Sequence, residues 1–423
     1  MSEVASQLPV RAEVTPQSVD ELVQVVRSAY AQSEPVYPVG GGTSLGYGLP
    51  AVRPGTALHM SALNRVVDYP ARDLTITVEA GITIARLREL LASEGQQLPI
   101  DVPHADRATL GGVLATNWNG PRRLGYGQLR DHVIGVRAVD GRGETFSGGG
   151  RVVKNVAGYD FCKLLTGSLG TLGVIYEVTL KLKPIPPASV LVVCAPDNHQ
   201  HMARLLDDLA LGPLPATSIS WVAGPDWRSA APWSDFSDPI AQETGWLAVG
   251  FDGTSAEVEW LTAELQRRWA RNDMSRATAW TGQTLSDAWQ TLTEFPDQAP
   301  APIVLQAVGV PSGTGKLVAA MQAIDPACSI LAHAGSGVVL ARLSRVPASG
   351  LSRALTGELG MAAAAAQGYV QVISNPDRIE VTPRITWGGA DLPRQLMLSI
   401  KRQFDPRFVL NPQRFVYHEP SPA

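Results

Sequence analysis

Three glycine-rich turns lie in the first half of the chain, and they constrain what it can fold into more than any other feature. They are found at Val39 to Ser44, at Thr109 to Asn117 and at Leu164 to Gly173. Because glycine has no Cβ, each turn lets the backbone approach a ligand closely. Each turn taken alone is also compatible with an ordinary loop. One long ligand that meets all three explains them better than three unrelated loops do.

The first turn, Val39-Gly40-Gly41-Gly42-Thr43-Ser44, has the composition of an anion-binding loop. Its successive amides can converge on one anion, and Thr43 and Ser44 add hydroxyl donors. A pyrophosphate is the natural ligand for such a loop. The turn is not a P-loop, since no Gly-Lys-Ser/Thr follows it, and its spacing does not fit the Rossmann fingerprint.

The other two turns flank a locally basic region. From Pro121 to Lys163 there are eight Lys or Arg residues against four Asp or Glu residues. This bias suits an anionic cofactor or acid. A solvated charged face would give the same composition, so that alternative stays open.

The composition of the whole chain narrows the class of protein. The chain has 423 residues, 45% of them hydrophobic, with 35 Lys+Arg against 39 Asp+Glu and a net charge of −4. This length suits two domains, the hydrophobic fraction excludes a mainly disordered chain, and the charge argues against nucleic-acid binding. Cys162, Cys194 and Cys328 are too far apart for a disulfide framework or a CxxC metal pair, which fits a reducing compartment. Since no apolar run approaches the ~18 residues of a membrane span and no secretion signal is seen, we expect a cytoplasmic protein.

A proline-rich stretch at Lys183 to Pro187 divides the chain. Before it, the patterns predict two helices, which open at Thr15-Pro16 and at Thr83, and strands at 36–39, 74–80, 133–139, 144–147 and 174–182. After it, we predict a helix from Thr254, strands at 190–194, 246–251, 303–310 and 338–343, and an α+β module. We expect a long loop at 221–235 and find no repeat of fixed period. Nine of the ten tryptophans lie beyond residue 200, where they indicate core or an interface rather than a cofactor site.

The glycine-rich turns resemble the FAD-binding domain of the vanillyl-alcohol oxidase superfamily. The resemblance rests on Pro38 to Ser44, on Leu110-Gly111-Gly112 and on Gly167 to Ile175. Residues 122–184 are similar to the FAD-binding subunit of bacterial glycolate oxidase, and the run from Val153 to Asp160 is the most specific match. Similarity returns at 404–406 and 411–412, where that family usually ends in Asn-Pro-Gly and this chain has Asn411-Pro412-Gln413.

The resemblance implies an α+β chain with a PCMH-type FAD-binding domain of two α/β subdomains at 1–187. An α+β cap domain with an antiparallel sheet would follow at 188–375, and 376–423 would return to the FAD domain. The pyrophosphate of FAD would lie on the amides of the first turn. The residues that would bind or line FAD by matching position are Val39, Gly40, Gly41, Gly42, Thr43, Ser44, Leu110, Gly111, Gly112, Asn117, Tyr126, Asp131, Val133, Gly158, Tyr159 and Ile175.

Two departures from related proteins shape the expected chemistry. Covalent members of the superfamily usually tether the flavin through a His beside the glycine loop, but here the loop has Thr43 and Ser44, and His59 is too far along. We therefore expect non-covalent FAD. Related D-2-hydroxy-acid dehydrogenases carry a His-Ala-Gly-Asp-Gly-Asn-x-His motif, whereas this chain reads His333-Ala334-Gly335-Ser336-Gly337-Val338-Val339-Leu340. With one of the ligating groups left, we expect no metal.

Oxidation of a 2-hydroxy acid needs a cation for the carboxylate, a base for the hydroxyl proton and the flavin N5 as hydride acceptor. Arg378 and Arg384 are candidate cations, and His333 or His418 is the candidate base. Each has a structural alternative. His333 can be a buried core histidine, His418 a surface residue, and the arginines part of a salt-bridged strand with Glu380 and Thr382.

Three functions remain open. The favoured one is the FAD-binding subunit of a glycolate oxidase complex, which helps to oxidise glycolate to glyoxylate. It would act beside a catalytic flavoprotein subunit and an iron–sulfur subunit, since this chain has no cluster-binding cysteine run. The complex would lie at the inner face of the membrane. The alternatives are a stand-alone FAD-dependent 2-hydroxy-acid dehydrogenase and a non-catalytic FAD-binding scaffold.

Overall fold

The computed structural model describes residues 4, 7–150, 159–235, 244–274, 276–297, 301–388 and 393–415. The chain forms two compact units. Unit 1 comprises Met1–Asn119, Gln128–Ile185 and Asp391–Ala423, and unit 2 comprises Gly120–Gly127 and Pro186–Ala390. The structure thus places a short segment of the expected FAD domain, Gly120–Gly127, with the second unit. Among the described residues, no helix is both long and apolar enough to cross a membrane.

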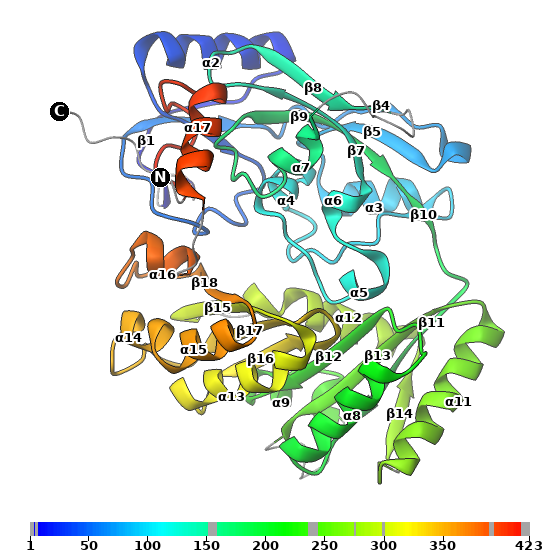
Figure 1. Ribbon diagram of the computed structural model, residues 1–423. Coiled ribbons are helices and arrows are strands. Elements are labelled where there is room, and N and C mark those ends of the chain that lie inside the picture. Colours follow the sequence, from blue (N-terminus) through cyan, green and yellow to red (C-terminus); the bar gives the residue numbers. More distant parts are fainter. Residues whose placement is uncertain are drawn as a thin grey trace. The chain divides into compact units, whose positions relative to one another are not determined.

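Unit 1 contains two main sheets (Figure 1). The first is parallel, with the order β1 (Val10–Val14), β3 (Gly55–His59), β2 (Val36–Val39). The second is antiparallel, with the order β4 (Val66–Asp68), β5 (Thr75–Glu79), β9 (Val174–Lys181), β7 (Val133–Val139), β8 (Thr145–Gly149). A short ladder pairs β10 (Lys183–Pro184) with β6 (Gln96–Gln97). These sheets confirm the α+β class and the strands predicted for this half.

The helices of unit 1 begin where the sequence offers capping residues. Ser18 caps α2 (Val19–Gln32) and Thr83 caps α3 (Ile84–Ala92), because each side chain accepts a hydrogen bond from an amide in the first turn. Thr109 does the same for α4, and Asp160 does so for α7. The remaining helical elements are α4 (Leu110–Thr116), α6 (Leu129–His132), α7 (Phe161–Leu165), α17 (Arg394–Phe404) and the 3-10 turn η1 (Ala71–Asp73).

Unit 2 is built on one antiparallel sheet of eight strands. Their order is β14 (Ala277–Trp280), β11 (Ala188–Cys194), β13 (Trp246–Gly253), β12 (Ser218–Ala223), β16 (Ser329–His333), β17 (Val338–Leu343), β15 (Ile303–Val308) and β18 (Tyr369–Ser374). The helices are α5 (Arg123–Tyr126), α8 (His199–Leu211), α9 (Pro225–Ser229), α11 (Ser255–Arg271), α12 (Gly282–Glu294), α13 (Thr314–Ile324), α14 (Leu351–Thr356), α15 (Glu358–Ala365) and α16 (Pro383–Trp387). The 3-10 turns are η2 (Trp233–Asp235), η3 (Phe295–Asp297), η4 (Pro311–Gly313) and η5 (Ala334–Ser336). The predicted antiparallel cap sheet is therefore present.

This sheet contains an internal repeat that the sequence did not reveal. The elements β11-α8-β12-β13-α11-β14 have β-α-β-β-α-β connectivity, and β15-α13-β16-β17-(α14, α15)-β18 repeat it. Both halves place their four strands in the same relative order. They are joined where the second strand of one, β12, pairs with the second strand of the other, β16.

Two hydrophobic layers sandwich the sheet of unit 2. One layer packs against α8, α11, α13, α14 and α15, and the other packs against α9 and α12 (Figure 1). Trp227 and Trp233 are fully buried in the second layer, and their rings meet edge to face. The tryptophan-rich region is thus mainly core.

Two local predictions for this half are wrong. Residues 221–235 are not one long loop, because Trp221 lies in β12 and α9 and η2 follow. The strand expected through Arg378, Glu380 and Thr382 is also absent. Arg378 and Glu380 have φ angles of 52° and 49°, which belong to left-handed turns and not to extended backbone. Glu380 instead accepts hydrogen bonds from the amides of Leu351 and Ser352 at the start of α14.

Candidate functional site

The first glycine-rich turn follows β2 directly and presents unused amides. Among the described residues, no acceptor is found for the backbone N–H groups of residues 40–44. Arg107 lies beside this loop, with its Nη2 atom 3.9 Å from the point that a Cβ would occupy at Gly42. Free amides with a guanidinium beside them suit an anion such as a pyrophosphate. Sequence reasoning missed Arg107 because nothing in its immediate neighbours marks it.

The first two glycines of this turn have a packing role. A Cβ at Gly41 would clash with the carbonyl oxygen of Arg107, and a Cβ at Gly40 would clash with the hydroxyl of Thr109. Both glycines are therefore required by the close approach of residues 107–109 to this turn, through the backbone of Arg107 and the side chain of Thr109. By contrast, Gly46 has open space around it.

The second turn is α4 and its cap. The Thr109 hydroxyl accepts a hydrogen bond from the amide of Gly112 at 3.3 Å, and the amide of Gly111 donates to the carbonyl of Ala80 at 2.8 Å. A Cβ at Gly111 would lie 2.9 Å from the Cβ of Ala80. The amides of this turn are thus already used, and its glycines bring α4 close to the end of β5.

The third turn packs against the other end of α4. The amides of Gly167 and Leu169 donate to the carbonyls of Leu114 and Ala115, both at 2.9 Å. Gly167 adopts a φ of +79°, where a Cβ would come within 3.3 Å of Asn117, the C-cap of α4. Thus the three predicted turns form one assembly, with α4 between the first and the third.

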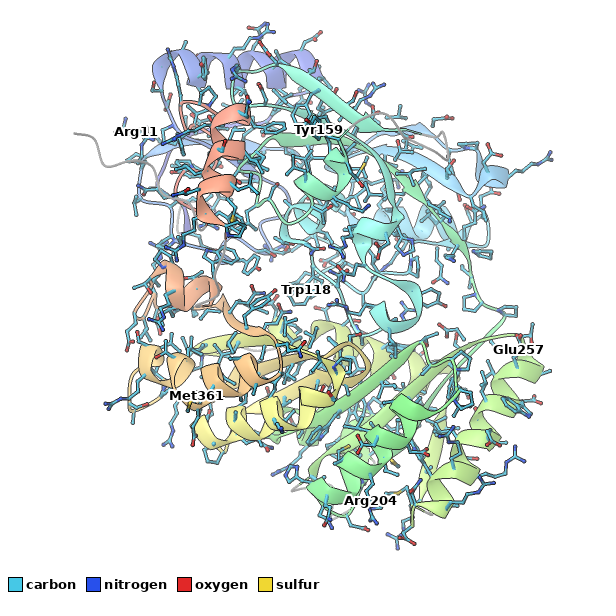
Figure 2. All side chains as sticks on the ribbon, viewed as in Figure 1. Arg11, Trp118, Tyr159, Arg204, Glu257 and Met361 are labelled. Atoms are coloured by element: carbon cyan, nitrogen blue, oxygen red, sulfur yellow. The ribbon has the colours of Figure 1, made fainter. Side chains whose placement is uncertain are left out.

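Two buried polar atoms in this assembly have no protein partner. The hydroxyl of Ser168 and the indole Nε1 of Trp118 make no hydrogen bond with any described residue. Ser168, in the third turn, is 5% exposed, and Trp118 follows the C-cap of α4 (Figure 2). Because an unpaired buried donor is costly, such atoms mark where a polar ligand or water completes the structure. The residues of this assembly therefore fit a long, polar cofactor.

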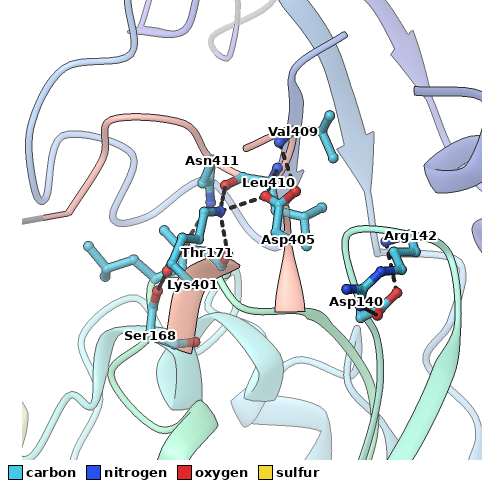
Figure 3. Close-up of polar contacts among 10 residues, drawn as sticks. Asp140, Arg142, Ser168, Thr171, Lys401, Asp405, Val409, Leu410 and Asn411 are labelled. Carbon is cyan, nitrogen blue, oxygen red and sulfur yellow. Dashed lines mark hydrogen bonds and ion pairs between the residues drawn. The ribbon is translucent and has the colours of Figure 1, made fainter. Parts of the chain in front are cut away.

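The C-terminal segment returns to this assembly through a buried ion pair. Lys401 and Asp405 are fully buried, and Lys401 Nζ lies 2.6 Å from Asp405 Oδ2 (Figure 3). The same ammonium donates to the carbonyls of Thr171 at 2.6 Å and Leu410 at 2.9 Å. Asp405 also accepts from the amide of Leu410 at 2.7 Å. The pair thereby holds the end of α17 against the third turn.

Two further residues of the C-terminal segment hold the loops. Asn411 Nδ2 donates to the carbonyl of Leu169 at 2.6 Å. Arg414 Nη2 donates to the carbonyls of Leu45 and Tyr47, at 2.6 and 2.8 Å, in the continuation of the first turn. Gln413 between them has a φ of 65°, the left-handed conformation that glycine adopts most easily.

The other residues expected to line the cofactor lie on several elements. Val133 and Ile175 are buried in β7 and β9, while Asp131 is exposed and accepts a hydrogen bond from the amide of Gln128 at the start of α6. Tyr126 lies in unit 2, where its hydroxyl donates to Asp252 at 2.7 Å. Tyr159 is 84% exposed (Figure 2). Gly158, with the rest of 153–158, lies outside the described residues.

The candidate catalytic residues of the second half lie on different elements. His333 is 2% exposed at the end of β16, Arg378 lies in a turn and Arg384 lies on α16. His418 lies outside the described residues. In the part of the chain that the structure describes, no group of three or more His, Cys, Asp or Glu side chains could hold a metal.

The three cysteines are free and buried. Burial raises the pKa of Cys162 to about 11 and that of Cys328 to about 12, and it raises the pKa of Cys194 as well. All three are therefore neutral thiols at physiological pH and are poor ligands or nucleophiles.

Comparison with protein families identifies the domain that contains the first two turns. Residues 10–149 match the family described as FAD binding domain. The chain thus contains an FAD-binding domain, and FAD is its cofactor. The residues above would hold it as described, with the pyrophosphate on the amides of residues 40–44.

Similar curated proteins include a D-2-hydroxyglutarate dehydrogenase of Xanthomonas citri pv. viticola, which is 39% identical over 43% of this chain and 39% of its own length. Glycolate oxidase subunit GlcE of Escherichia coli is 33% identical over 49% of this chain and 58% of its own length. The chain therefore spans less than two thirds of the length of these relatives. Glycolate oxidase subunit GlcD of Bacillus subtilis is 25% identical over 95% of this chain and 88% of its own length.

A solved alkyldihydroxyacetonephosphate synthase shares the fold. Its TM-score is 0.66 and its sequence identity is 19%, over 95% of this chain and 75% of that one. At this identity the likeness concerns the fold alone.

Proposed function

We propose that this chain is the FAD-binding subunit of a glycolate oxidase-type complex and takes part in the oxidation of glycolate, a 2-hydroxy acid, to glyoxylate. The observation that carries the proposal is the assembly of three glycine-rich turns around α4 in an FAD-binding domain. Relatives named as glycolate oxidase subunits and as D-2-hydroxyglutarate dehydrogenase support the substrate class.

Within this proposal, FAD supplies the two-electron acceptor. The amides of residues 40–44 bind its pyrophosphate, and Arg107 balances the charge. No tether is expected at the loop, which has Thr43 and Ser44 where covalent relatives have His. His59 is already engaged, since its Nε2 lies 3.0 Å from Glu13 Oε2. The flavin is therefore held non-covalently.

This chain and its partner subunits together supply the groups that bind and oxidise the substrate. His333 is the candidate base of this chain, and Arg378 and Arg384 are the candidate cations. We expect a catalytic flavoprotein subunit to carry the more complete set of substrate groups and an iron–sulfur subunit to accept the electrons. The three buried neutral thiols are unsuited to hold a cluster, which fits this division. The complex would dock at the inner face of the membrane through these partners.

The test is an anaerobic visible spectrum of the purified chain with FAD, before and after the addition of glycolate. The proposal predicts that the flavin band persists with glycolate alone and bleaches when the sister subunits are added. Bleaching by glycolate alone would favour a stand-alone 2-hydroxy-acid dehydrogenase. A flavin that stays oxidised while the complete complex consumes glycolate would leave the chain as a scaffold.

A further inference from the structure

Trp260 differs from the other tryptophans of the chain in being mainly exposed. Its exposed fraction is 58%, whereas the others are buried or half-buried. Its indole makes no hydrogen bond or ring contact with any described residue. Exposure of so large an apolar side chain to water is unfavourable, and tryptophan is strongly enriched among the residues that anchor protein interfaces. Trp260 therefore marks a candidate interface.

The helix that carries Trp260 has one face toward its own sheet and a second, solvent-exposed row of side chains. α11 packs against β11 and β13, and its buried residues are Val258, Leu261, Leu265 and Trp269. The second row has the same spacing of three and four residues, which keeps its members on one side of the helix. Four of its residues are exposed, and the side chain of Glu264 is 26% exposed. We call this row, which consists of Glu257, Trp260, Glu264, Arg267 and Arg271, the α11 seam.

The α11 seam is acidic at its start and basic at its end. Glu257 lies at the N-terminal end of α11 (Figure 2), and only its Oε2 atom is engaged, by the amide and the hydroxyl of Thr254. At the other end, Arg271 forms no ion pair with any described residue. Between them, Arg267 Nη2 lies 2.8 Å from Glu264 Oε2. A row with opposite charges at its two ends complements a copy of itself that runs in the opposite direction.

The spacing of the α11 seam also fixes the register of such a pair. A twofold axis at Glu264 places Glu257 of one copy opposite Arg271 of the other, because each lies seven residues from Glu264. The same axis brings Trp260 opposite Arg267, and a guanidinium over an indole ring is favourable. A parallel pair would instead place like charges opposite each other at both ends, so the charges select the antiparallel arrangement.

We propose that the α11 seam is a self-association surface, through which two copies of this chain form an antiparallel, twofold-symmetric dimer. Each copy covers its Trp260 with Arg267 of the other copy, and an ion pair of Glu257 with Arg271 forms at each end. A single helix face buries less than the roughly 800 Å² per partner of a standard interface, so the dimer is weak and depends on concentration. The proposal goes beyond the function proposed above and does not depend on it.

Sedimentation equilibrium of the full chain with FAD bound, from about 1 to 100 μM, tests the dimer. We expect the wild type to dimerise in this range and Trp260→Ala to dimerise at least ~tenfold more weakly. Met361→Ala, which removes a 64% exposed apolar side chain from α15 of the same unit, is the matched control and should dimerise as the wild type does. A wild type that stays monomeric throughout this range, or a Trp260→Ala dimer as stable as that of the control, would overturn the proposal.

Charge reversal tests the antiparallel register. Arg271→Glu alone and Glu257→Arg alone each put like charges opposite each other at both ends of the dimer, so each should dimerise at least ~tenfold more weakly than the wild type. An equimolar mixture of these two variants should associate as the wild type does, because each end of the mixed dimer again pairs an acid with an arginine. Arg204→Glu, at an exposed position of α8, is the charge control and should dimerise normally.

A mixture that associates no better than its two components would show that Glu257 and Arg271 do not meet, which also overturns the proposal. Since Glu257 belongs to the capping box of α11, circular dichroism first compares the helix content of the variants. Should Glu257→Arg lose helix content, the comparison of Trp260→Ala and Arg271→Glu with their controls decides the result. A chain that dimerises equally well in all these variants uses another surface and contradicts the assignment.

Discussion

At the scale of single residues, the C-terminal segment shows how few side chains hold distant parts of unit 1 together. Lys401 contacts the third glycine-rich turn through the carbonyl of Thr171, and Arg414 contacts the continuation of the first turn. Both are at least nine-tenths buried. A charged side chain is buried only where all its donors find acceptors, so these residues fix the path of the segment.

Removing one member of the buried pair should be strongly destabilising. Lys401→Met leaves the carboxylate of Asp405 buried without its counter-ion, and the expected loss is about 3–5 kcal/mol of unfolding free energy. Urea unfolding measures it. The double variant Lys401→Met, Asp405→Asn should lose less than the sum of the single variants. Arg402→Met, at an exposed neighbour, is the control, and a Lys401→Met variant as stable as that control would contradict this role.

Gln413 is the second residue for which we can predict whether a substitution raises or lowers the unfolding free energy. Its left-handed φ costs a residue with a Cβ about 1 kcal/mol, and no hydrogen bond of its side chain with a described residue would be lost. Gln413→Gly should therefore raise the unfolding free energy by up to about 1 kcal/mol, while Gln413→Ala should not. Thermal and urea unfolding compare the three proteins. A glycine variant less stable than the alanine variant would show that the backbone is not strained here.

At the scale of elements, α4 organises the assembly of the three glycine-rich turns. Its N-cap meets the first turn and its C-cap meets the third, so a seven-residue helix sets the spacing of the two. The sequence predicted the three turns, and the structure brings them together. The sequence could not distinguish a glycine that faces a ligand from one that faces the protein, because both positions require a residue without a Cβ. Only the structure shows that Gly41 faces the backbone of Arg107.

Substitution of Gly41 and of Gly46, which lie in the same loop, tests whether a glycine there is required by contact with the protein or by contact with the ligand. Gly41→Ala should destabilise unit 1 and release FAD together, because the added Cβ clashes with the protein backbone. Gly46→Ala meets open space and should keep both stability and flavin. Unfolding of the FAD-free chain and the flavin content of the purified protein are measured for each. A Gly41→Ala chain with unchanged FAD-free stability that still loses flavin would assign the glycine to the ligand.

At the scale of the whole molecule, sequence patterns predicted the division near Pro187 and most strands, because alternation and proline-rich breaks are local signals. They did not reveal the repeat in unit 2, since its two halves share connectivity rather than residues. They also assigned Tyr126 to the flavin domain, although its hydroxyl binds Asp252 in unit 2. The membership of the short segment Gly120–Gly127 in unit 2 depends on tertiary contacts, which produce no periodic pattern in the sequence.

The central claim is that unit 1 holds one FAD with its pyrophosphate on the amides of residues 40–44 beside Arg107. Titration of the FAD-free full chain with FAD, followed by flavin fluorescence, tests it most directly. We predict one flavin per chain in the wild type and in the control Arg86→Gln, an exposed residue of α3. Arg107→Gln should bind FAD about tenfold more weakly, since a charge-assisted hydrogen bond contributes about 1.5–3 kcal/mol and solvent exposure reduces it. Equal affinity of Arg107→Gln and Arg86→Gln would contradict the placement of the pyrophosphate, and a chain that binds no FAD would contradict the account as a whole.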